Sequence, residues 1–235
     1  MKIGIISDIH GNDAALKVVL ADALSVGVEH LLILGDIVGY YYSPDIVLRQ
    51  LEDWSYDMIS GNHEHMLAKS LTDDSYLEKI SSKYGSGIKV AIDKLSKEQV
   101  TRLSNLPDSL TVNIDGLNIG LYHGSPNDVD EYVYPDAELK LLKKISRSGD
   151  DFVLMGHTHY PMCVHIDGVT IVNPGSVGQP RDIGGLASWA IINTNNNMVI
   201  HRRVKFPVEK LIQVCLEKDP ENEYLRSVLM RDVNL

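Results

Sequence analysis

The first 36 residues read MKIGIISDIHGNDAALKVVLADALSVGVEHLLILGD (1–36), and they establish the expected topology. Residues 2–7 form an apolar run typical of a buried strand. Asn12 is a suitable N-cap for the apolar-periodic segment that follows, and Gly27 suits the end of that helix. Residues 31–34 are a second short apolar run, so this stretch predicts strand, helix and strand in succession.

The pattern continues downstream. Pro44 can open a helix that reaches about residue 54, and residues 56–60 read as a third strand. Alternation of this kind predicts a parallel sheet with right-handed crossovers. Residues 64–106 are expected to be mainly helical.

The second half of the chain has the signature of antiparallel strands. Turn residues separate paired apolar runs at Asp115-Gly116, at Asp167-Gly168 and in an Asn-rich segment. The chain is therefore predicted to be an α/β protein with two sheets stacked between helices. We expect one domain over residues 1–205, with residues 206–235 forming a helical tail packed on it. The expected hairpin strands are 111–114 with 117–122, 162–166 with 169–172, and 187–192 with 198–203; a helix is expected at 135–145 and a strand at 152–155.

Composition excludes several classes of protein. Of the 235 residues, 44% are hydrophobic and 23% are charged, which is an ordinary globular balance. The net charge of −10 disfavours nucleic acid or an anionic membrane as the main partner. Cys163 and Cys215 are the two cysteines, and neither belongs to a Cys-x-x-Cys pair. The sequence has no signal-peptide pattern and no apolar run of about 20 residues, so a cytoplasmic location is expected.

Five polar motifs each follow directly on an apolar, strand-like run. Ligands of open α/β sheets bind beyond the carboxyl ends of strands, so these motifs are expected to meet at one rim. The motif Gly156-His157-Thr158-His159, with its two alternating histidines, is difficult to explain by packing alone. The motifs are Asp8-x-His10, Gly35-Asp36, Gly61-Asn62-His63-Glu64, His123, and Gly156-His157-Thr158-His159.

The first four motifs have ordinary explanations when they are taken one at a time. Asp8 and His10 could be a helix cap and a surface histidine, and Asp36 could belong to a turn. Asn62 could cap a helix, and His123 could be a buried histidine with satisfied hydrogen bonds. Their occurrence in this order on one chain, each after a strand, instead predicts a metal centre.

The donor set indicates which metals would bind. Nitrogen and oxygen ligands without thiolate suit Mn, Fe, Zn, Ni or Co better than Ca or Mg. Seven protein ligands are too many for a single catalytic ion, but they fit two ions about 3.5–4 Å apart that share a carboxylate. Two divalent cations with Asp8 and Asp36 would leave a charge of about +2, which attracts phosphate.

These motifs resemble those of the calcineurin-like metallophosphoesterase superfamily, whose pattern is Asp-x-His, Gly-Asp, Gly-Asn-His-Asp/Glu, His and Gly-His-x-His. The resemblance covers residues 1–205 and is strongest to the small, single-domain prokaryotic branch. It is supported by GDIVGYYYSP (35–44), HGSPND (123–128) and NPGSVGQPRD (173–182). The fold that the resemblance implies is a four-layer α/β/β/α sandwich.

The resemblance also implies a division of roles. His63 would be the catalytic histidine, which donates a proton to the leaving oxygen after attack by a metal-bridging hydroxide. Asp36 would bridge two divalent ions, of which Mn²⁺ is the expected species. One ion would be held by Asp8, His10, Asp36 and His159, and the other by Asp36, Asn62, His123 and His157.

Two departures from the family pattern affect the substrate site. Gly39 and Tyr40 stand where the protein-phosphatase branch has an Asp that orients the catalytic histidine and an Arg that clamps phosphate. Arg181 could replace that clamp, or it could form an ion pair with Asp182 or another acid. Tyr40 and the two tyrosines after it could stack on a base or aryl group, or could simply cover a loop.

Three functions remain open from the sequence. The first is hydrolysis of a small phosphodiester or phosphomonoester. The second is cleavage of nucleotide or dinucleoside polyphosphates by a pyrophosphatase. The third is a non-catalytic interaction scaffold, against which the intact His63 and full ligand set argue.

Overall fold

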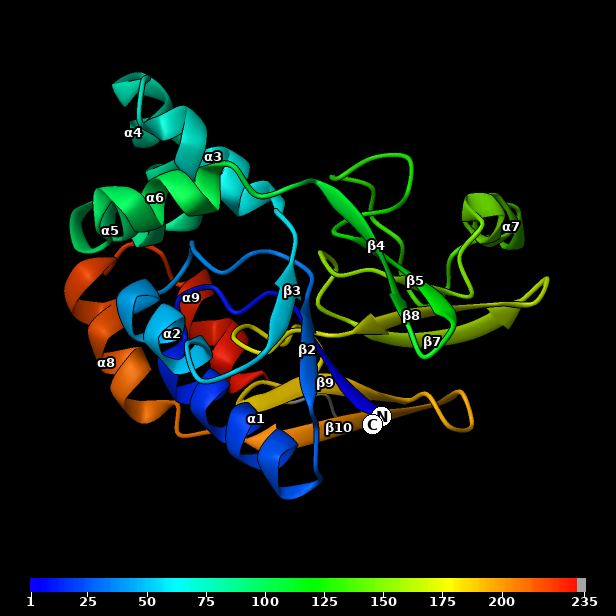
Figure 1. Ribbon diagram of the computed structural model, residues 1–235. Coiled ribbons are helices and arrows are strands. Elements are labelled where there is room, and N and C mark those ends of the chain that lie inside the picture. Colours follow the sequence, from blue (N-terminus) through cyan, green and yellow to red (C-terminus); the bar gives the residue numbers. More distant parts are fainter. Residues whose placement is uncertain (232–235) are drawn as a thin grey trace.

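The computed structural model describes residues 1–231, and its amino-terminal part follows the predicted alternation of strands and helices (Figure 1). Strands β1, β2 and β3 pair in parallel. The later strand β9 pairs antiparallel with β1, and β10 pairs antiparallel with β9, so β10 runs parallel to β1. The order across the sheet is β10-β9-β1-β2-β3. The elements are β1 (Lys2–Ile6), α1 (Asp13–Ser25), β2 (His30–Ile33), α2 (Pro44–Leu51), β3 (Tyr56–Met58), β9 (Leu186–Asn193) and β10 (Met198–Lys205).

The second sheet is built from the predicted hairpins. Its order is β4-β5-β6-β8-β7, in which β5, β6 and β8 run parallel. Asp115-Gly116 and Asp167-Gly168 form the two tight turns, and all four residues have positive φ, as such turns require. The strands are β4 (Ser109–Ile114), β5 (Leu117–Tyr122), β6 (Phe152–Leu154), β7 (Pro161–Ile166) and β8 (Val169–Pro174).

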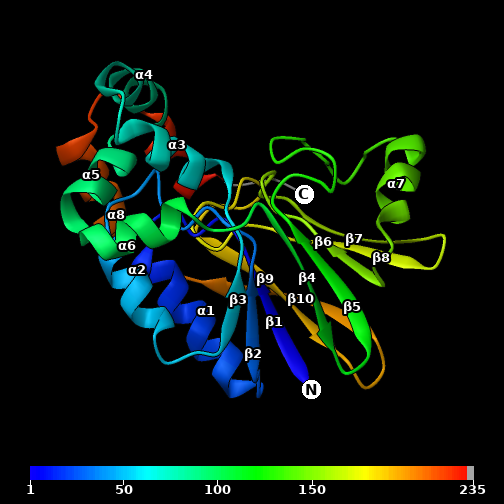
Figure 2. The ribbon, with the colours of Figure 1, turned by 45° about the horizontal axis from the view of Figure 1, so that its top comes forward.

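Strand periodicity explains how the layers pack. In β1, Ile3 and Ile5 face the second sheet, whereas Ile6 faces the helices, because successive side chains alternate between faces. In β6, Phe152 faces the first sheet, and Val153 packs under helix α7 (Leu139–Ile145) on the outer face. The predicted four-layer α/β/β/α sandwich is therefore confirmed, with α1 and α2 on one outer face and α7 on the other (Figure 2).

A helical region and the carboxyl-terminal tail complete the helical side. The predicted helical stretch after β3 forms four helices, and the tail forms two helices and a short 3₁₀ turn. Phe206, Cys215 and Leu225 of the tail are buried in the same core cluster as α1 and α2. The expected tail extends over residues 206–235, of which residues 232–235 lie outside the described part. The helices are α3 (Asn62–Ser70), α4 (Asp74–Tyr84), α5 (Gly87–Lys94), α6 (Lys97–Ser104), α8 (Glu209–Lys218) and α9 (Tyr224–Ser227).

Two predicted helices are shorter in the structure. The second helix ends at Leu51 rather than near residue 54, where turn-forming residues precede β3. The helix expected over 135–145 begins at Leu139, because the preceding residues form a turn in which the Ala137 amide donates to the Tyr134 carbonyl. Both errors concern helix ends, where local turn hydrogen bonds compete with helix formation.

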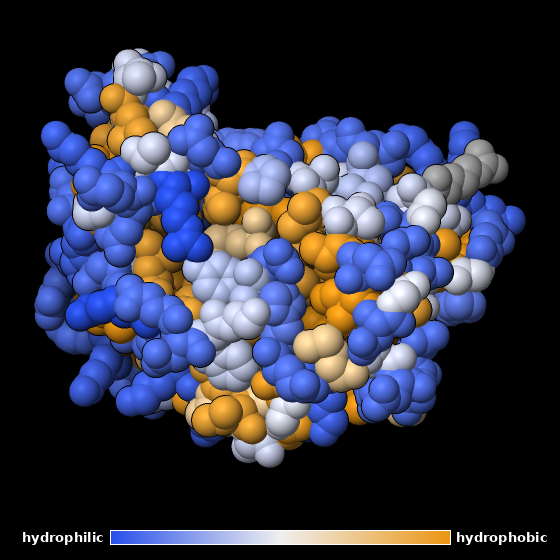
Figure 3. Space-filling model, viewed as in Figure 1, coloured by the Kyte–Doolittle hydropathy of each residue, from blue (hydrophilic) through white to orange (hydrophobic). Residues whose placement is uncertain are grey.

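The face shown in Figure 3 is mostly hydrophilic. Hydrophilic side chains cover most of the helical half of the face in Figure 3, and apolar side chains are interspersed toward its middle. The longest helix of residues 1–231, α1, has 13 residues, and no helix in this range combines the length and apolar character needed to cross a bilayer.

Candidate metal centre

The predicted site residues lie at the carboxyl ends of the parallel strands. Both sheets direct these ends to one side of the molecule, as expected for ligand sites in α/β proteins. Of the seven predicted ligands, Asn62 is half-buried and the other six are buried. Asp8 and His10 follow β1, Asp36 follows β2, Asn62 and His63 follow β3, His123 follows β5, and His157 and His159 follow β6.

The structure brings the ligand atoms of these side chains close enough together to bind the same metal ions. Three overlapping groups have ligand atoms within 4.8 Å of one another. Asp36 Oδ2 is 3.3 Å from His123 Nε2, and Asp8 Oδ1 is 3.1 Å from His159 Nε2. The groups are Asp8–His10–His159, His10–Asp36–His63 and Asp8–Asp36–His123.

Hydrogen bonds to main-chain carbonyls define the tautomers of three imidazoles. A carbonyl oxygen can only accept, so each contacting Nδ1 carries the proton and each neutral ring presents its lone pair at Nε2. The Nε2 atoms of His10 and His159 then face each other at 3.2 Å. If both rings are neutral, two lone pairs at this distance repel, and either a proton on one ring or a metal ion between them relieves the repulsion. The Nδ1 contacts are His10 to Val38 O at 3.1 Å, His123 to Leu34 O at 2.7 Å, and His159 to Gln179 O at 2.6 Å.

Unpaired acceptors support the same conclusion. Asp8 Oδ1 and His157 Nε2 are buried, and neither makes a hydrogen bond within the described residues. His123 Nε2 lies 3.1 Å from Asn62 Oδ1, which is another acceptor if the amide has this orientation. Buried acceptors are costly without a donor or a cation. The cluster therefore fits divalent metal ions.

The pKa values of the imidazoles agree with this interpretation. Burial lowers the pKa of His157 to about 4, and it lowers the pKa of His10 as well, so both rings are neutral at neutral pH. Burial by itself would lower the pKa of His123, but the charge and hydrogen bond of Asp36, the charge of Asp8 and the hydrogen bond to Leu34 O together raise that pKa to about 10. A positive charge next to Asp36 is thus strongly favoured, whether it is a proton or a metal ion.

Backbone strain is concentrated at the same place. Nine non-glycine residues among residues 1–231 have positive φ, and three of them lie in hairpin turns. Each costs about 1–2 kcal/mol, which is tolerated where function requires it. The other six border the cluster: Asp8, His10, Asp36, Tyr40, His157 and His159.

Glu64 was part of a predicted motif, but the sequence did not reveal its role. Its buried carboxylate accepts the main-chain N–H groups of Gly61, Asp36, Ile37 and Val38 at 2.8–3.2 Å. The bond from the Gly61 N–H to Glu64, the third residue of α3, caps the start of this helix. Burial, with the neighbouring Asp36, raises the pKa of Glu64 to about 7. Glu64 therefore holds the loop that presents Asp36.

His63 is oriented by packing. A Cβ atom on Gly39 would lie 1.9 Å from His63 Nδ1, so the ring occupies the space that a side chain at position 39 would need. Nδ1 is buried without a hydrogen bond. The ring instead packs against His10, Tyr40 and Tyr84, with centroid distances of 4.7, 4.8 and 5.5 Å. Nε2 is consequently the nitrogen that can face a substrate.

The three consecutive tyrosines have different roles. Tyr40 lines the site beside His63. Tyr41 is buried, and its hydroxyl donates to the Leu225 carbonyl. Tyr42 donates to Asp219 of the tail at 2.7 Å. Tyr40 is therefore the one member of the run at the cavity, and the other two anchor the tail.

Arg181 also lies at the cavity. The ion pair considered for it with Asp182 does not form, because Asp182 pairs with Arg203. The Arg181 guanidinium is 3.4 Å from the Tyr40 hydroxyl, and its Nε is buried without a hydrogen bond. Its charge is thus available to an anion in the cavity.

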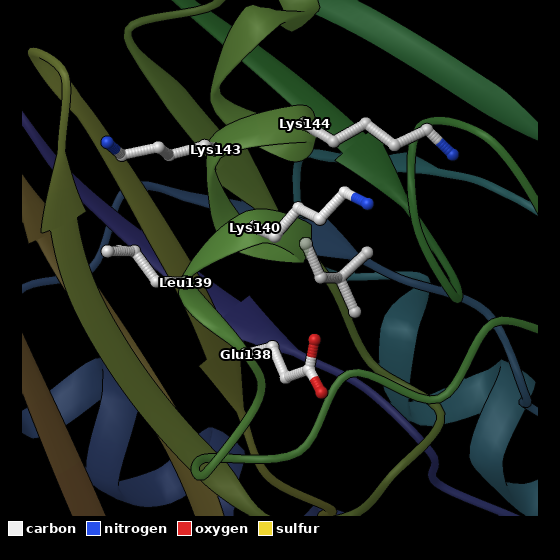
Figure 4. A pocket seen from close by; sticks show the side chains of 6 residues that line it. Glu138, Leu139, Lys140, Lys143 and Lys144 are labelled. Atoms are coloured by element: carbon white, nitrogen blue, oxygen red, sulfur yellow. The ribbon is translucent and has the colours of Figure 1, made fainter.

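The cavity has a volume of about 20 Å³, enough for an ion or a water molecule. A larger depression of about 680 Å³ runs along α7, but its lysines point in different directions, and none of the candidate metal-binding groups found among residues 1–231 lies there (Figure 4). Of the two, the small cavity is the one that is lined by the predicted metal ligands. Its lining residues are Asp36, Tyr40, Asn62, His63, Tyr84, Tyr132, His157, His159 and Arg181.

Tyr84 and Tyr132 were not predicted. Tyr84 ends α4, and Tyr132 lies in the irregular segment between β5 and α7. Neither belongs to a motif, and nothing in the sequence separates them from the chain's other tyrosines.

Comparisons with known proteins agree with this geometry. The chain is 30% identical over 227 residues to an uncharacterized protein of Methanocaldococcus jannaschii, covering 88% of this chain and 89% of that protein. It is 29% identical over 185 residues to a probable metallophosphoesterase of Methanothermobacter thermautotrophicus, covering 77% and 80%. A crystal structure of a metallophosphoesterase from Sphaerobacter thermophilus superposes with a TM-score of 0.79 at 27% identity, covering 97% and 98%.

The fold and the buried cluster at its strand ends define a metal-dependent phosphoric ester hydrolase. Residues 1–197 match the model of the calcineurin-like phosphoesterase superfamily domain. The chain belongs to that superfamily.

Proposed function

We propose that the protein is a two-metal phosphoesterase that hydrolyses a small phosphodiester or phosphomonoester. One observation carries the proposal: two of the acid–imidazole groups share Asp36, whose Oδ2 lies 3.7 Å from His10 Nε2 and 3.3 Å from His123 Nε2. A single cation cannot compensate acceptors distributed over the whole cluster, whereas two cations sharing one carboxylate can.

The ligands divide according to their contacts. Asp8, His10 and His159 form one of the three groups, and Asp8 also shares a group with Asp36 and His123. His123 and Asn62 are paired, and the His157 ring lies 5.0 Å from that of His123. We therefore assign Asp8, His10, Asp36 and His159 to the first ion, and Asp36, Asn62, His123 and His157 to the second.

The chain's own residues perform the remaining tasks. Bound divalent ions would supply a hydroxide at neutral pH and offset phosphate charge. His63 holds a proton at Nε2 and donates it to the leaving oxygen. Arg181 holds a phosphate oxygen, and Tyr40 supports both side chains.

Removal and replacement of metal tests the function. Chelator-treated protein is expected to be inactive on bis(p-nitrophenyl) phosphate, and Mn²⁺ is expected to restore more activity than Mg²⁺ or Ca²⁺, because the donor set is nitrogen-rich. The measurement is p-nitrophenolate release against metal content, with Fe²⁺, Zn²⁺, Ni²⁺ and Co²⁺ in parallel. Absence of hydrolysis with every metal would support the scaffold instead. Cleavage confined to dinucleoside polyphosphates would support the pyrophosphatase.

Arg181→Ala is expected to raise KM about 10- to 100-fold, since it removes a charge-assisted contact to phosphate. Arg49→Ala, an exposed arginine on α2, is the control and should leave KM unchanged. The measurement is steady-state kinetics of both variants on bis(p-nitrophenyl) phosphate. Unaltered KM and kcat in Arg181→Ala would remove this residue from the substrate site.

A cytoplasmic location is part of the proposal. It is supported by the placement of the two cysteines on separate elements, Cys163 in β7 and Cys215 in α8.

A further inference from the structure

Two exposed tyrosines stand beside the metal site in the segment between β5 and α7. Tyr132 is 51% exposed and Tyr134 is 39% exposed, whereas Val133 between them is buried in the core beneath α7. The two tyrosine rings stack on each other, so both project to the same side of the segment. The chain thus presents two aromatic rings to solvent at a fixed place.

The rings are already ordered with respect to each other. Tyr132 and Tyr134 stack with an interplanar angle of 19° and centroids 5.9 Å apart. The preceding loop is held by the Ser125 hydroxyl, which donates to Glu131, and by the Ser125 amide, which donates to the Asp128 carbonyl. Little conformational entropy would be lost if a planar group packed on this pair.

The tyrosine pair adjoins the substrate site directly. The Tyr132 ring lies 4.1 Å from that of the proposed ligand His157, and Tyr132 lines the cavity. Tyr134 contacts Tyr160, whose hydroxyl donates to the main-chain carbonyl of Arg181. Tyr132, Tyr134 and Tyr160 therefore form a row of aromatic rings, called here the aromatic wall, that extends from His157 to the main chain of Arg181.

Tyr132 and the proposed acid His63 line the same small cavity, but their rings pack against different neighbours. His63 packs against His10, Tyr40 and Tyr84, whereas Tyr132 packs against His157. The leaving group must lie next to His63, which protonates it. The group on the tyrosine pair is then the one that stays on phosphorus.

We infer that Tyr132 and Tyr134 bind a planar aromatic ring on the retained group of a phosphodiester, as in a nucleoside ester. The inference rests on the proposed function and narrows its substrate class. Aromatic rings on a rigid scaffold bind nucleobases by stacking, and such contacts tolerate different bases.

Two esters with the same leaving group test the inference. The p-nitrophenyl ester of thymidine 5′-monophosphate carries a base on the retained group, and methyl p-nitrophenyl phosphate does not. The native protein is expected to prefer the thymidine ester by about 5- to 100-fold in kcat/KM. Tyr132→Leu is expected to abolish most of this preference, and Tyr132→Phe, which keeps the ring, to retain it.

The ratio of the two rates separates binding from structural damage. If Tyr132 only shielded His157, Tyr132→Leu would slow both esters equally and leave the preference intact, which would overturn the inference. Tyr56→Leu, at the opposite end of β3, is the control variant and should keep the native ratio. Hydrolysis of both esters by the native protein without preference would also overturn the inference, but not the proposed function. Hydrolysis of neither by metal-loaded protein would refute the proposed function itself.

Discussion

Asp36→Asn is expected to abolish hydrolysis, with a loss of at least about 1000-fold in kcat/KM, because a shared carboxylate supports several kcal/mol of charge stabilisation. Asp36 Oδ2 faces both His10 and His123, at 3.7 and 3.3 Å. An amide at this position neutralises the charge that both ions would share. Elemental analysis should show less metal per chain, and kinetics on bis(p-nitrophenyl) phosphate should show the loss.

The variant is conservative enough to be interpretable. Asp36 Oδ1 accepts the main-chain N–H of His63 at 2.9 Å, and the oxygen of an asparagine can accept the same bond. The start of α3 should therefore be preserved, which a thermal melt can verify. Asp53→Asn changes an exposed carboxylate and is the matched control. Full activity and full metal content in Asp36→Asn would refute the shared-carboxylate arrangement.

His63→Ala is expected to lower kcat by about 100- to 10,000-fold while the metal content stays at the native level. The reason is loss of the proton donor at the leaving oxygen. The loss should be smaller for p-nitrophenyl esters than for alkyl esters, because p-nitrophenolate leaves without much help from an acid. Kinetics on both ester types, with metal analysis of the same samples, provide the measurement.

The geometry makes the metal analysis informative. His63 belongs to one of the three groups with ligand atoms within 4.8 Å, together with His10 and Asp36. If His63→Ala lost metal, His63 would be a ligand, and the assignment as acid would be rejected. His65→Ala, on the same helix with an exposed ring paired to Asp108, is the matched control. Gly39→Ala is a second variant that should slow turnover by displacing the His63 ring, since its Cβ would lie 1.9 Å from Nδ1.

Much of the fold could be predicted because its signals are local. The buried apolar strands β1 and β6, the Asn12 cap of α1 and the two Asp-Gly turns are each confirmed. Errors lay at the ends of elements: β3 ends at Met58 and not at residue 60, and α2 and α7 are shorter than predicted because hydrogen bonds of the flanking turns determine their boundaries. These bonds depend on the packing of neighbouring elements, which periodicity does not describe.

The site could be predicted in part because its residues directly follow predicted strands. Strand order and direction bring Asp8, Asp36 and His123 to one rim, so residues that follow strands directly were identified from their position in the chain. Their roles as ligands stay predictions. The space left by Gly39 and filled by His63, and the pairing of Asp182 with Arg203, could not be predicted, because they depend on distances between side chains.

Chain order and residue type were thus sufficient for the layered architecture, for the set of metal-binding side chains and for the expectation of phosphate chemistry. Only packing in three dimensions revealed that the Nε2 atoms of His10 and His159 face each other, that Glu64 holds the Asp36 loop, and that Tyr132 stands at the cavity. The physical reason is the range of the interactions. Strand and turn signals act over a few neighbouring residues, whereas these contacts join residues that lie far apart along the chain and meet only when the two sheets pack together.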